Sequence, residues 1–263
     1  MRNHAAQFIT EIRKFHRHNI WRVFSDYCEL AACSLSNSVS IGAAWEKREA
    51  QYLGIAQGYN KEEMSIFPKL LAITVEALEH EMQDFLGAVF MELELGNHWK
   101  GQYFTPYPVS RLMAEITYAG EMDRSVSQRG FITLSDPACG AGCMIIAFAE
   151  VMRTKEIDYQ RQLHATCVDV DATAAHMAFI QLSLLHIPAI IVVGNSLSLE
   201  TRDTFYTPAH VLGLWSSKLS ARNSAAKADT EGSIVADPLA QFSAVAAQRP
   251  SPLQSCIQIS LFD

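Results

Sequence analysis

The sequence predicts an α/β protein in which a helical region precedes a parallel β-sheet. Between about residues 101 and 215, short apolar strands alternate with helical segments, an order typical of parallel strands joined by right-handed crossovers. Before residue 100, apolar residues recur at helical spacing with few turn residues between them. After residue 216, the chain is rich in Ala, Ser, Gln and Pro and poor in aromatic residues, so it cannot bury enough surface to fold alone.

These changes in composition and apolar pattern predict three regions. Residues 1–100 form a helical N-terminal domain, residues 101–215 an α/β domain, and residues 216–263 a flexible tail. The strands and helices expected in the α/β domain are Phe131–Leu134, Met144–Met152, His164–Val170, Ala172–Leu185 and Pro188–Val193, in that order.

Composition limits the classes of function. The longest apolar runs, such as Ile187–Val193, are too short to span a bilayer, and residues 1–17 lack the apolar stretch of a signal peptide. We therefore expect a cytoplasmic protein without a membrane partner. The net charge of −7 argues against binding nucleic acid by overall charge, although basic residues gather near the start of the chain, either as a local basic face or as a solvated helix face.

The six cysteines include no CxxC pair and no nearby histidine that would complete a zinc site. We expect them to be buried free thiols, and we predict no metal ligand.

A glycine-rich turn, Asp136-Pro137-Ala138-Cys139-Gly140-Ala141-Gly142, connects the first expected strand to its helix. Gly140 and Gly142 allow the backbone to come close to a ligand, and the following helix N-terminus offers N–H groups to an anion. A G-x-G turn alone is a weak signal, because nucleotide-binding folds and purely structural turns share it.

Polar residues at the ends of the next two strands make the signal stronger. Asp169 ends the second strand, where an acidic side chain binds a ribose diol in nucleotide-binding sheets. Asp169 could instead cap the next helix, but Asp171 fits that role better. Asn195 follows the third strand at the same edge of the sheet, and ligands of open α/β sheets bind along this edge.

Together with the upstream segment Gly101-Gln102-Tyr103-Phe104-Thr105-Pro106, this turn resembles the motif pair of adenine-N6 DNA methyltransferases. The most similar members are modification subunits of type I restriction systems. The resemblance covers roughly residues 75–200 and implies a Rossmann-like, S-adenosylmethionine-dependent methyltransferase fold whose sheet could be truncated. It also implies double-stranded DNA as substrate and other restriction–modification subunits as partners.

The resemblance assigns cofactor-binding roles by position. Thr105 and its neighbours would contact the methionine end of S-adenosylmethionine, the turn would wrap the cofactor, and Asp169 would hold its ribose. Asn195 stands where the family usually has an aspartate that binds the adenine amino group, so we expect weaker but not absent binding. The implied cofactor residues are Gln102, Tyr103, Phe104, Thr105, Pro106, Asp136, Pro137, Ala138, Cys139, Gly140, Gly142, Asp169 and Asn195.

The family's catalytic loop, Asn/Asp-Pro-Pro-Tyr/Phe, is not found in the sequence. Asp237 and Pro238 are a weak substitute without the second proline or the aromatic residue. The segment Thr204–Pro208 has aromatic residues and a proline but no expected preceding strand, so packing over the truncated edge of the sheet is the simpler role for Phe205, Tyr206 and Trp215. The catalytic residues are thus unknown, and a catalytically defective, cofactor-binding partner or anti-restriction protein is the alternative function.

The chain ends in Gln258-Ile259-Ser260-Leu261-Phe262-Asp263, which resembles the peptide that docks proteins on the bacterial sliding clamp. Leu261 and Phe262 would fill an apolar pocket, while Gln258 would anchor through its amide and Ile259 would lie between them. The alternative is a terminal strand at the sheet edge, because apolar residues alternate along this segment.

Overall fold

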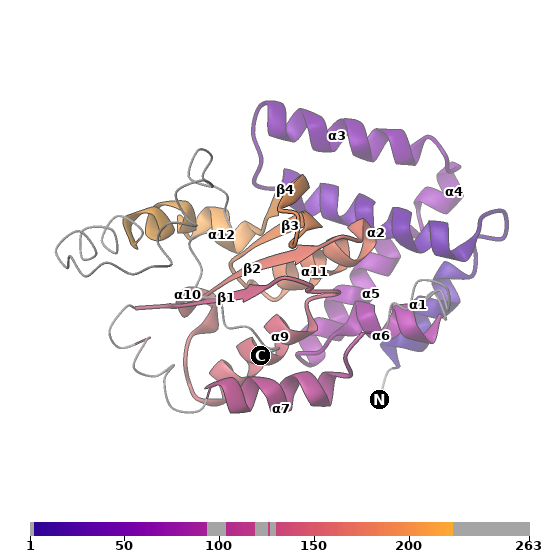
Figure 1. The fold of residues 1–263 in the computed structure, drawn as a ribbon. Coiled ribbons are helices and arrows are strands. Elements are labelled where there is room, and N and C mark those ends of the chain that lie inside the picture. Colours follow the sequence, from indigo (N-terminus) through magenta and orange to yellow (C-terminus); the bar gives the residue numbers. More distant parts are fainter. Residues whose placement is uncertain (1–2, 94–103, 119–125, 127–129, 223–263) are drawn as a thin grey trace, which may run out of the picture.

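A computed structural model describes residues 3–93, 104–118, 126 and 130–222. Figure 1 shows helices and strands in one mixed α/β arrangement, which confirms the predicted fold class. The weak catalytic candidates Asp237 and Pro238 and the terminal segment from Gln258 lie outside the described residues.

The N-terminal region is helical, as predicted. Asparagine side chains accept hydrogen bonds from backbone N–H groups at the start of three of its helices, with Asn60 forming a full capping box with Glu63. The helices are α1 (His4–Ile12), α2 (Ile20–Asn37), α3 (Ala43–Ala56), α4 (Lys61–Met64), α5 (Phe67–His80) and α6 (Phe85–Glu92).

Four strands form one sheet in the order β1-β2-β3-β4. β1 (Ile132–Asp136), β2 (Leu163–Asp169) and β3 (Ala189–Asn195) are parallel, and each was expected from its apolar run. The connecting and flanking helices are α7 (Tyr107–Tyr118), α9 (Cys143–Thr154), α10 (Tyr159–Gln162), α11 (Ala172–Leu184) and α12 (Pro208–Leu212). Both crossovers contain a buried helix, α9 or α11, as a parallel pair requires.

The fourth strand, β4 (Glu200–Tyr206), is a difference from the sequence prediction. It pairs antiparallel with β3, and most of its residues are exposed or half-buried, so it carries no apolar alternation that would have indicated a strand. The segment Thr204–Pro208 thus spans the end of β4, the N-cap Thr207 and the first residue of α12.

The aromatic residues near β4 pack in different ways. Phe205 is 1% exposed and contacts Phe179, which confirms its expected packing role at the sheet edge. Trp215 is also 1% exposed, but it packs against Phe131 and His164 at the starts of β1 and β2. Tyr206 remains 43% exposed and packs only in part, with its ring centroid 5.1 Å from that of His210.

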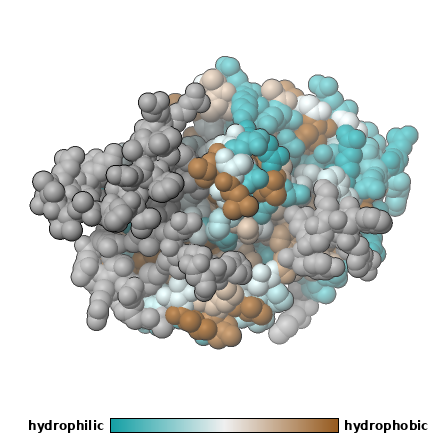
Figure 2. Space-filling model, viewed as in Figure 1, coloured by the Kyte–Doolittle hydropathy of each residue, from teal (hydrophilic) through white to brown (hydrophobic). Residues whose placement is uncertain are grey.

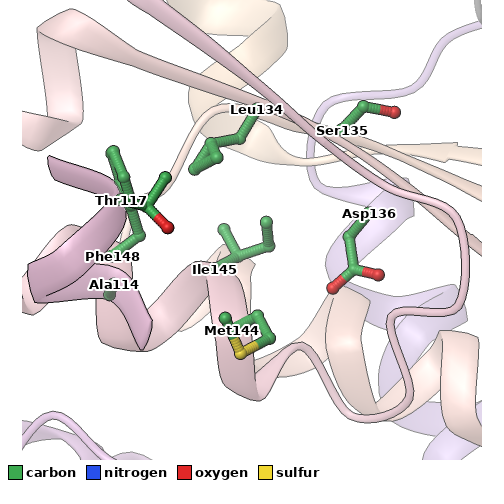
Figure 3. Close-up of a pocket in the computed structure, with 8 residues that line it drawn as sticks. All are labelled: Ala114, Thr117, Leu134, Ser135, Asp136, Met144, Ile145 and Phe148. Carbon is green, nitrogen blue, oxygen red and sulfur yellow. The ribbon is translucent and has the colours of Figure 1, made fainter. Parts of the chain in front are cut away.

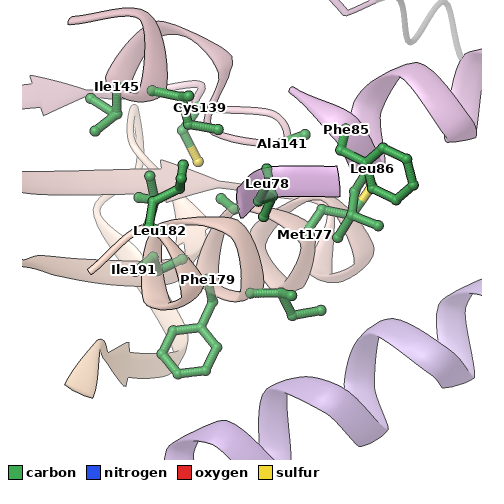
Figure 4. Packing of buried hydrophobic residues seen from close by; sticks show 14 of the residues in the cluster. Leu78, Phe85, Leu86, Cys139, Ala141, Ile145, Met177, Phe179, Leu182 and Ile191 are labelled. Atoms are coloured by element: carbon green, nitrogen blue, oxygen red, sulfur yellow. The ribbon is translucent and has the colours of Figure 1, made fainter. Parts of the chain in front are cut away.

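The helical region and the sheet share one hydrophobic core among the described residues. Figure 4 shows Leu78 and Leu86 of the helical region beside Met177 and Leu182 of α11, next to Ala141 of the glycine-rich turn. Figure 1 shows the helical region at the carboxyl ends of the parallel strands and α12 at their opposite ends. The helical region therefore supports the edge of the sheet where the polar strand ends gather.

The five described cysteines are free and buried, as predicted. No helix among the described residues is long and apolar enough to cross a lipid bilayer.

A buried ion pair attaches β4 to the helical region. The Arg48 guanidinium of α3 donates to both carboxylate oxygens of Asp203, at 2.5 and 3.1 Å, and to the Thr204 carbonyl at 2.9 Å. It also lies 3.6 Å from the ring centroid of Phe205. Burial by itself would raise the pKa of Asp203, but hydrogen bonds from Arg48 and Lys47 outweigh it and hold that pKa below its usual value.

We predict that Asp203→Ala lowers the free energy of unfolding by about 3 kcal/mol, because it leaves a buried guanidinium without its carboxylate. Lys47→Ala removes the other cation that binds Asp203, but its side chain is half exposed, so its loss should change stability by less than about 1 kcal/mol. Urea unfolding of both variants measures the difference. Equal losses of unfolding free energy in the two variants would contradict the inference that Arg48 is the main partner of Asp203.

Three buried histidines make the fold sensitive to acid. Burial, with a contribution from His210, lowers the pKa of His164 to about 3, and burial lowers those of His176 and His210 to about 4. The His164 and His210 rings share a 2.9 Å hydrogen bond. An unfolded histidine titrates near pH ~6.5. Hence the unfolded chain takes up protons first as the pH falls, and stability is lost below about pH 6.5.

We expect the free energy of unfolding to fall between pH 7 and 5, by up to about 1.4 kcal/mol per pH unit for each buried histidine. His176→Phe should give a shallower pH dependence, because one titrating group is gone. Urea titrations at several pH values test this. A free energy that stays constant from pH 7 to 5 in the parent protein would refute it.

Candidate functional site

The polar ends of the three parallel strands lie along one edge of the sheet, as expected, and each extends past the one before it. Asp136 at the end of β1 pairs in register with Cys167, so Asp169 lies two residues farther along β2. Asp169 in turn pairs with Val193, so Asn195 lies two residues farther along β3. Each polar residue therefore extends beyond its neighbour along the carboxyl edge by about 6–7 Å, given the rise of a strand.

The turn after β1 crosses these strand ends and is hydrogen-bonded to β2. The Cys139 amide donates to the Val168 carbonyl at 3.0 Å, and the Gly140 amide donates to Asp169 Oδ2 at 2.8 Å. The Asp136 carboxylate stays at the start of the turn, where its Oδ1 accepts from the Ala138 amide at 3.1 Å. The turn and the end of β2 thus form one rigid unit.

Phe104 brings the upstream motif onto this turn. Gly140 has φ +54°, and a Cβ placed on it would lie 2.8 Å from the Phe104 ring. Only glycine satisfies both the left-handed backbone and this close approach. On its other side Phe104 packs against Phe90 of α6, with ring centroids 5.2 Å apart. The two motifs that were identified separately in the sequence are therefore in direct contact.

The residues after Phe104 are tied to α9. The carbonyl of Thr105 accepts from the Cys143 thiol at 3.5 Å, while the Thr105 and Pro106 side chains are exposed. The Tyr107 hydroxyl donates to Glu150 Oε2 at 2.9 Å. The exposed side chains of Thr105 and Pro106 are thereby left accessible to a ligand beside the turn.

Burial raises the pKa of both carboxyl groups beside the turn, Asp136 and Asp169. Backbone N–H groups oppose this rise at each residue. Asp169 accepts from the Gly140 and Asp171 amides, each at 2.8 Å, and the Val170 amide adds a smaller contribution. Asp171 itself accepts from the Thr173 and Ala174 amides at the start of α11. The expected role of Asp171 as the helix cap is confirmed by these bonds.

The donor set fits the part of S-adenosylmethionine that the resemblance assigns to it. Among the residues that the structure describes, no side chain caps α9, and Gly142 before it has φ +89°. The N–H groups of its first turn therefore face the loop without a described side-chain acceptor. A carboxylate has about four acceptor positions, so Asp169 keeps capacity for a ribose hydroxyl after its backbone bonds. These features suit a ligand with hydroxyl donors and an anionic end.

Asn195 is arranged differently from the expectation for it. Its side-chain oxygen accepts from the Leu197 amide at 2.9 Å and from the Ser198 amide at 3.2 Å. Both lone pairs of this oxygen are therefore engaged locally, and the amide nitrogen is the group left to face a ligand. An amide nitrogen donates hydrogen bonds, whereas the aspartate that usually stands here accepts them.

Apolar side chains surround the polar strand ends. Val170 after β2 and Leu197 and Leu199 after β3 are exposed, Leu197 by 94%. Figure 2 shows hydrophobic surface in the centre of the view, over the area of β2, β3 and β4. Such residues beside hydrogen-bonding groups suit a ligand with a flat apolar ring.

A small apolar pocket adjoins Asp136 on the other side of the turn. Figure 3 shows Asp136 at the side of this pocket opposite Phe148, with Leu134 and Ile145 between them. The remaining lining residues, Ala114, Thr117, Ser135 and Met144, come from α7, β1 and α9.

Some expected site residues lie outside the described part of the chain, namely Gln102 and Tyr103 of the upstream motif. Conversely, the structure adds residues that motif reasoning missed. Gln181 of α11 donates a hydrogen bond to Asp84 before α6. Gln181 also donates to the Ala141 carbonyl of the turn. The only sequence signal for Gln181 is a polar residue between the apolar residues Ile180 and Leu182 of a mostly apolar helical run.

Comparison with known proteins identifies the region that contains these motifs. Residues 94–211, less than half of the chain, match the family model described as N-6 DNA Methylase. The match begins before the Gly101–Pro106 motif and ends within α12, so it covers all four strands. No protein of curated function matches the chain.

Two solved structures show weak similarity. One is a Listeria monocytogenes protein described as a class I S-adenosylmethionine-dependent methyltransferase, with 12% identity and a TM-score of 0.39. The other is the methyltransferase subunit of a type I restriction-modification system from Streptococcus thermophilus, with 20% identity and a TM-score of 0.34. They cover 77% and 53% of this chain, which spans 56% and 28% of theirs. Both TM-scores are low, so neither fold nor function is inferred from these structures.

We predict that Gly140→Ala destabilises the protein for two separable reasons. A left-handed alanine costs about 1–2 kcal/mol, and its methyl group would collide with the Phe104 ring. Phe104→Ala removes the collision but not the backbone strain. A double-mutant cycle followed by urea unfolding should therefore show that Gly140→Ala costs less in the Phe104→Ala background. Strictly additive losses would contradict the contact between the two motifs.

Proposed function

Because the chain carries an N-6 DNA methylase region at residues 94–211, we propose that it is an S-adenosylmethionine-dependent DNA methyltransferase specific for adenine N6, of the type I modification-subunit kind. The observation that carries the proposal is the assembly of Phe104, Gly140 and Asp169. The ring of Phe104 covers Gly140, and the amide of Gly140 donates to Asp169. This assembly joins the two family motifs to the residue assigned to the ribose.

In this proposal each group of the site has a distinct role. Asp169 accepts hydrogen bonds from the ribose hydroxyls, and the backbone of the turn and the start of α9 bind the amino-acid end together with Thr105. Val170 and Leu197 provide apolar contacts to the adenine ring, and the Asn195 amide nitrogen donates to one of its ring nitrogens. When bound, S-adenosylmethionine supplies a methyl group on a positively charged sulfur for transfer to the adenine amino group.

Transfer requires more than these residues. A target adenine must leave the duplex, stack on an aromatic side chain and donate its amino hydrogens to acceptors. The sequence has no Asn/Asp-Pro-Pro-Tyr/Phe element, and the substitutes Asp237 and Pro238 are outside the described residues. We therefore propose that double-stranded DNA is bound together with other restriction–modification subunits, which supply the missing parts.

The missing catalytic element and the altered Asn195 favour a second candidate function. A chain that binds S-adenosylmethionine but transfers no methyl group would act as a partner or regulator of a restriction–modification complex. The terminal peptide from Gln258 to Asp263 would add clamp docking to either function, and it remains a separate proposal.

The test is a titration of cofactor affinity and labelled methyl transfer to mixed-sequence duplex DNA on one preparation. Asp169→Asn should weaken S-adenosylmethionine binding about 10- to 100-fold, because a charge-assisted hydrogen bond contributes about 1.5–3 kcal/mol. The control is Asp158→Asn before α10, whose half-exposed side chain does not cap that helix and should not affect binding.

Transfer by the chain, alone or with restriction–modification subunits, would support the enzyme. Binding without transfer under either condition would favour the regulatory function. Absence of S-adenosylmethionine binding by the parent protein would refute both.

A further inference from the structure

We propose that Gln181 and Asp84 are positioning residues that hold the turn between β1 and α9 in its ligand-binding conformation. The helical region would then help to hold the ligand-binding turn in place, through Asp84. The identity of the ligand rests on the proposed function, but the role in holding the turn does not.

Gln181 lies in the middle of α11 and is 0% exposed. Its side-chain nitrogen donates to the Ala141 carbonyl at 2.8 Å and to Asp84 Oδ1 at 2.9 Å, while its oxygen accepts from the Leu86 amide at 3.0 Å. These three bonds use both amide hydrogens and the carbonyl oxygen. Gln181 therefore joins three segments that are distant in the sequence, namely the turn, α11 and the start of α6.

The bond to Ala141 controls the most easily rotated part of the turn. Ala141 stands between Gly140 at φ +54° and Gly142 at φ +89°, and glycines permit many backbone conformations. The peptide between Ala141 and Gly142 is planar, so fixing its two polar atoms fixes its orientation. Its N–H donates to the Cys139 carbonyl at 2.8 Å, and its carbonyl accepts from Gln181. Without Gln181, the N–H of this peptide keeps its hydrogen bond to Cys139, but its carbonyl loses the bond described here.

Asp84 fixes the orientation of Gln181. Its carboxyl group accepts from the Gly87 amide at 2.9 Å, which caps α6, and from Gln181. Burial raises the pKa of Asp84, while hydrogen bonds from Gln181, Gly87 and Cys143 oppose the rise. The Cys143 thiol also lies within 3.2 Å of Ser110 Oγ on α7. The network thus reaches the end of the turn at Ala141, the first residue of α9 and the helix that follows the upstream motif.

Simple core packing does not account for this arrangement. The neighbours of Gln181 in α11, Ile180 and Leu182, are fully buried apolar residues, and methionine has nearly the same shape as glutamine. A buried amide lowers stability unless its polar atoms are satisfied, so a glutamine here needs specific partners. The partners it has are the turn itself and the residues that orient it.

The test compares Gln181→Met with a matched control, Tyr27→Phe. Tyr27 is also fully buried and its hydroxyl shares a 2.8 Å hydrogen bond with Thr74, but it lies within the helical region and bonds to no residue of the turn. We expect both variants to lower the melting temperature. Only Gln181→Met should raise the Kd for S-adenosylmethionine, by at least about tenfold, which corresponds to about 1.4 kcal/mol.

Gly87→Ala disturbs the same network without removing any of its polar atoms. A Cβ at Gly87 would lie 2.2 Å from the Asp84 carboxylate, so the carboxylate must move. Alanine favours a helix over glycine, yet we expect this variant also to bind S-adenosylmethionine more weakly. It provides a second measurement if Gln181→Met folds poorly.

Hydrogen–deuterium exchange separates this proposal from the proposed function, because it needs no ligand. In Gln181→Met and Gly87→Ala, amides of the turn at residues 138–142 should exchange at least tenfold faster than in the parent protein, and those of α1 and α2 should not. Faster exchange of the turn in these two variants, in a protein whose parent form binds no S-adenosylmethionine, would support the positioning role and refute the proposed ligand. Unchanged exchange of the turn, or an equal rise of Kd in Tyr27→Phe, would overturn the positioning role.

Discussion

The burial of α11 on nearly all sides is the constraint on which the rest of the structure depends. Every residue of this helix from 173 to 183 is buried, because the sheet lies on one side and the helical region on the other. A helix that is buried on all sides and mostly apolar cannot face water, so neither layer is complete without the other. The site at the carboxyl edge of the strands is built where these two layers meet.

Several buried polar groups join segments that are far apart in the chain. Gln181 connects the turn to α6, and Arg48 connects α3 to β4. Ser25 of α2 and Thr173 of α11 share a 2.9 Å hydrogen bond. Because unsatisfied buried polar groups are strongly unfavourable, these bonds select one arrangement of the layers among those that apolar packing would allow.

The chemistry of the proposed site follows from the same geometry. The stepped positions of Asp136, Asp169 and Asn195 follow from the register of the strands. The turn that crosses these strand ends is hydrogen-bonded to β2 and to Gln181 of α11. Bonds within the chain hold the hydrogen-bonding groups of such a site in position, so binding of a ligand requires little further ordering. The helical region contributes to this preorganisation through Phe90 and Asp84.

The sequence by itself determined the three parallel strands, their crossover helices, the helical N-terminal region and the turn that begins at Asp136, because each depends on local periodicity or on glycine and capping chemistry. It also indicated Asp171 as the helix cap. Only the tertiary structure decided that β4 is a strand, that the Asn195 oxygen is engaged locally and that Gln181 supports the turn. These three features depend on partners that are close in space but carry no periodic pattern, so a single sequence does not reveal them.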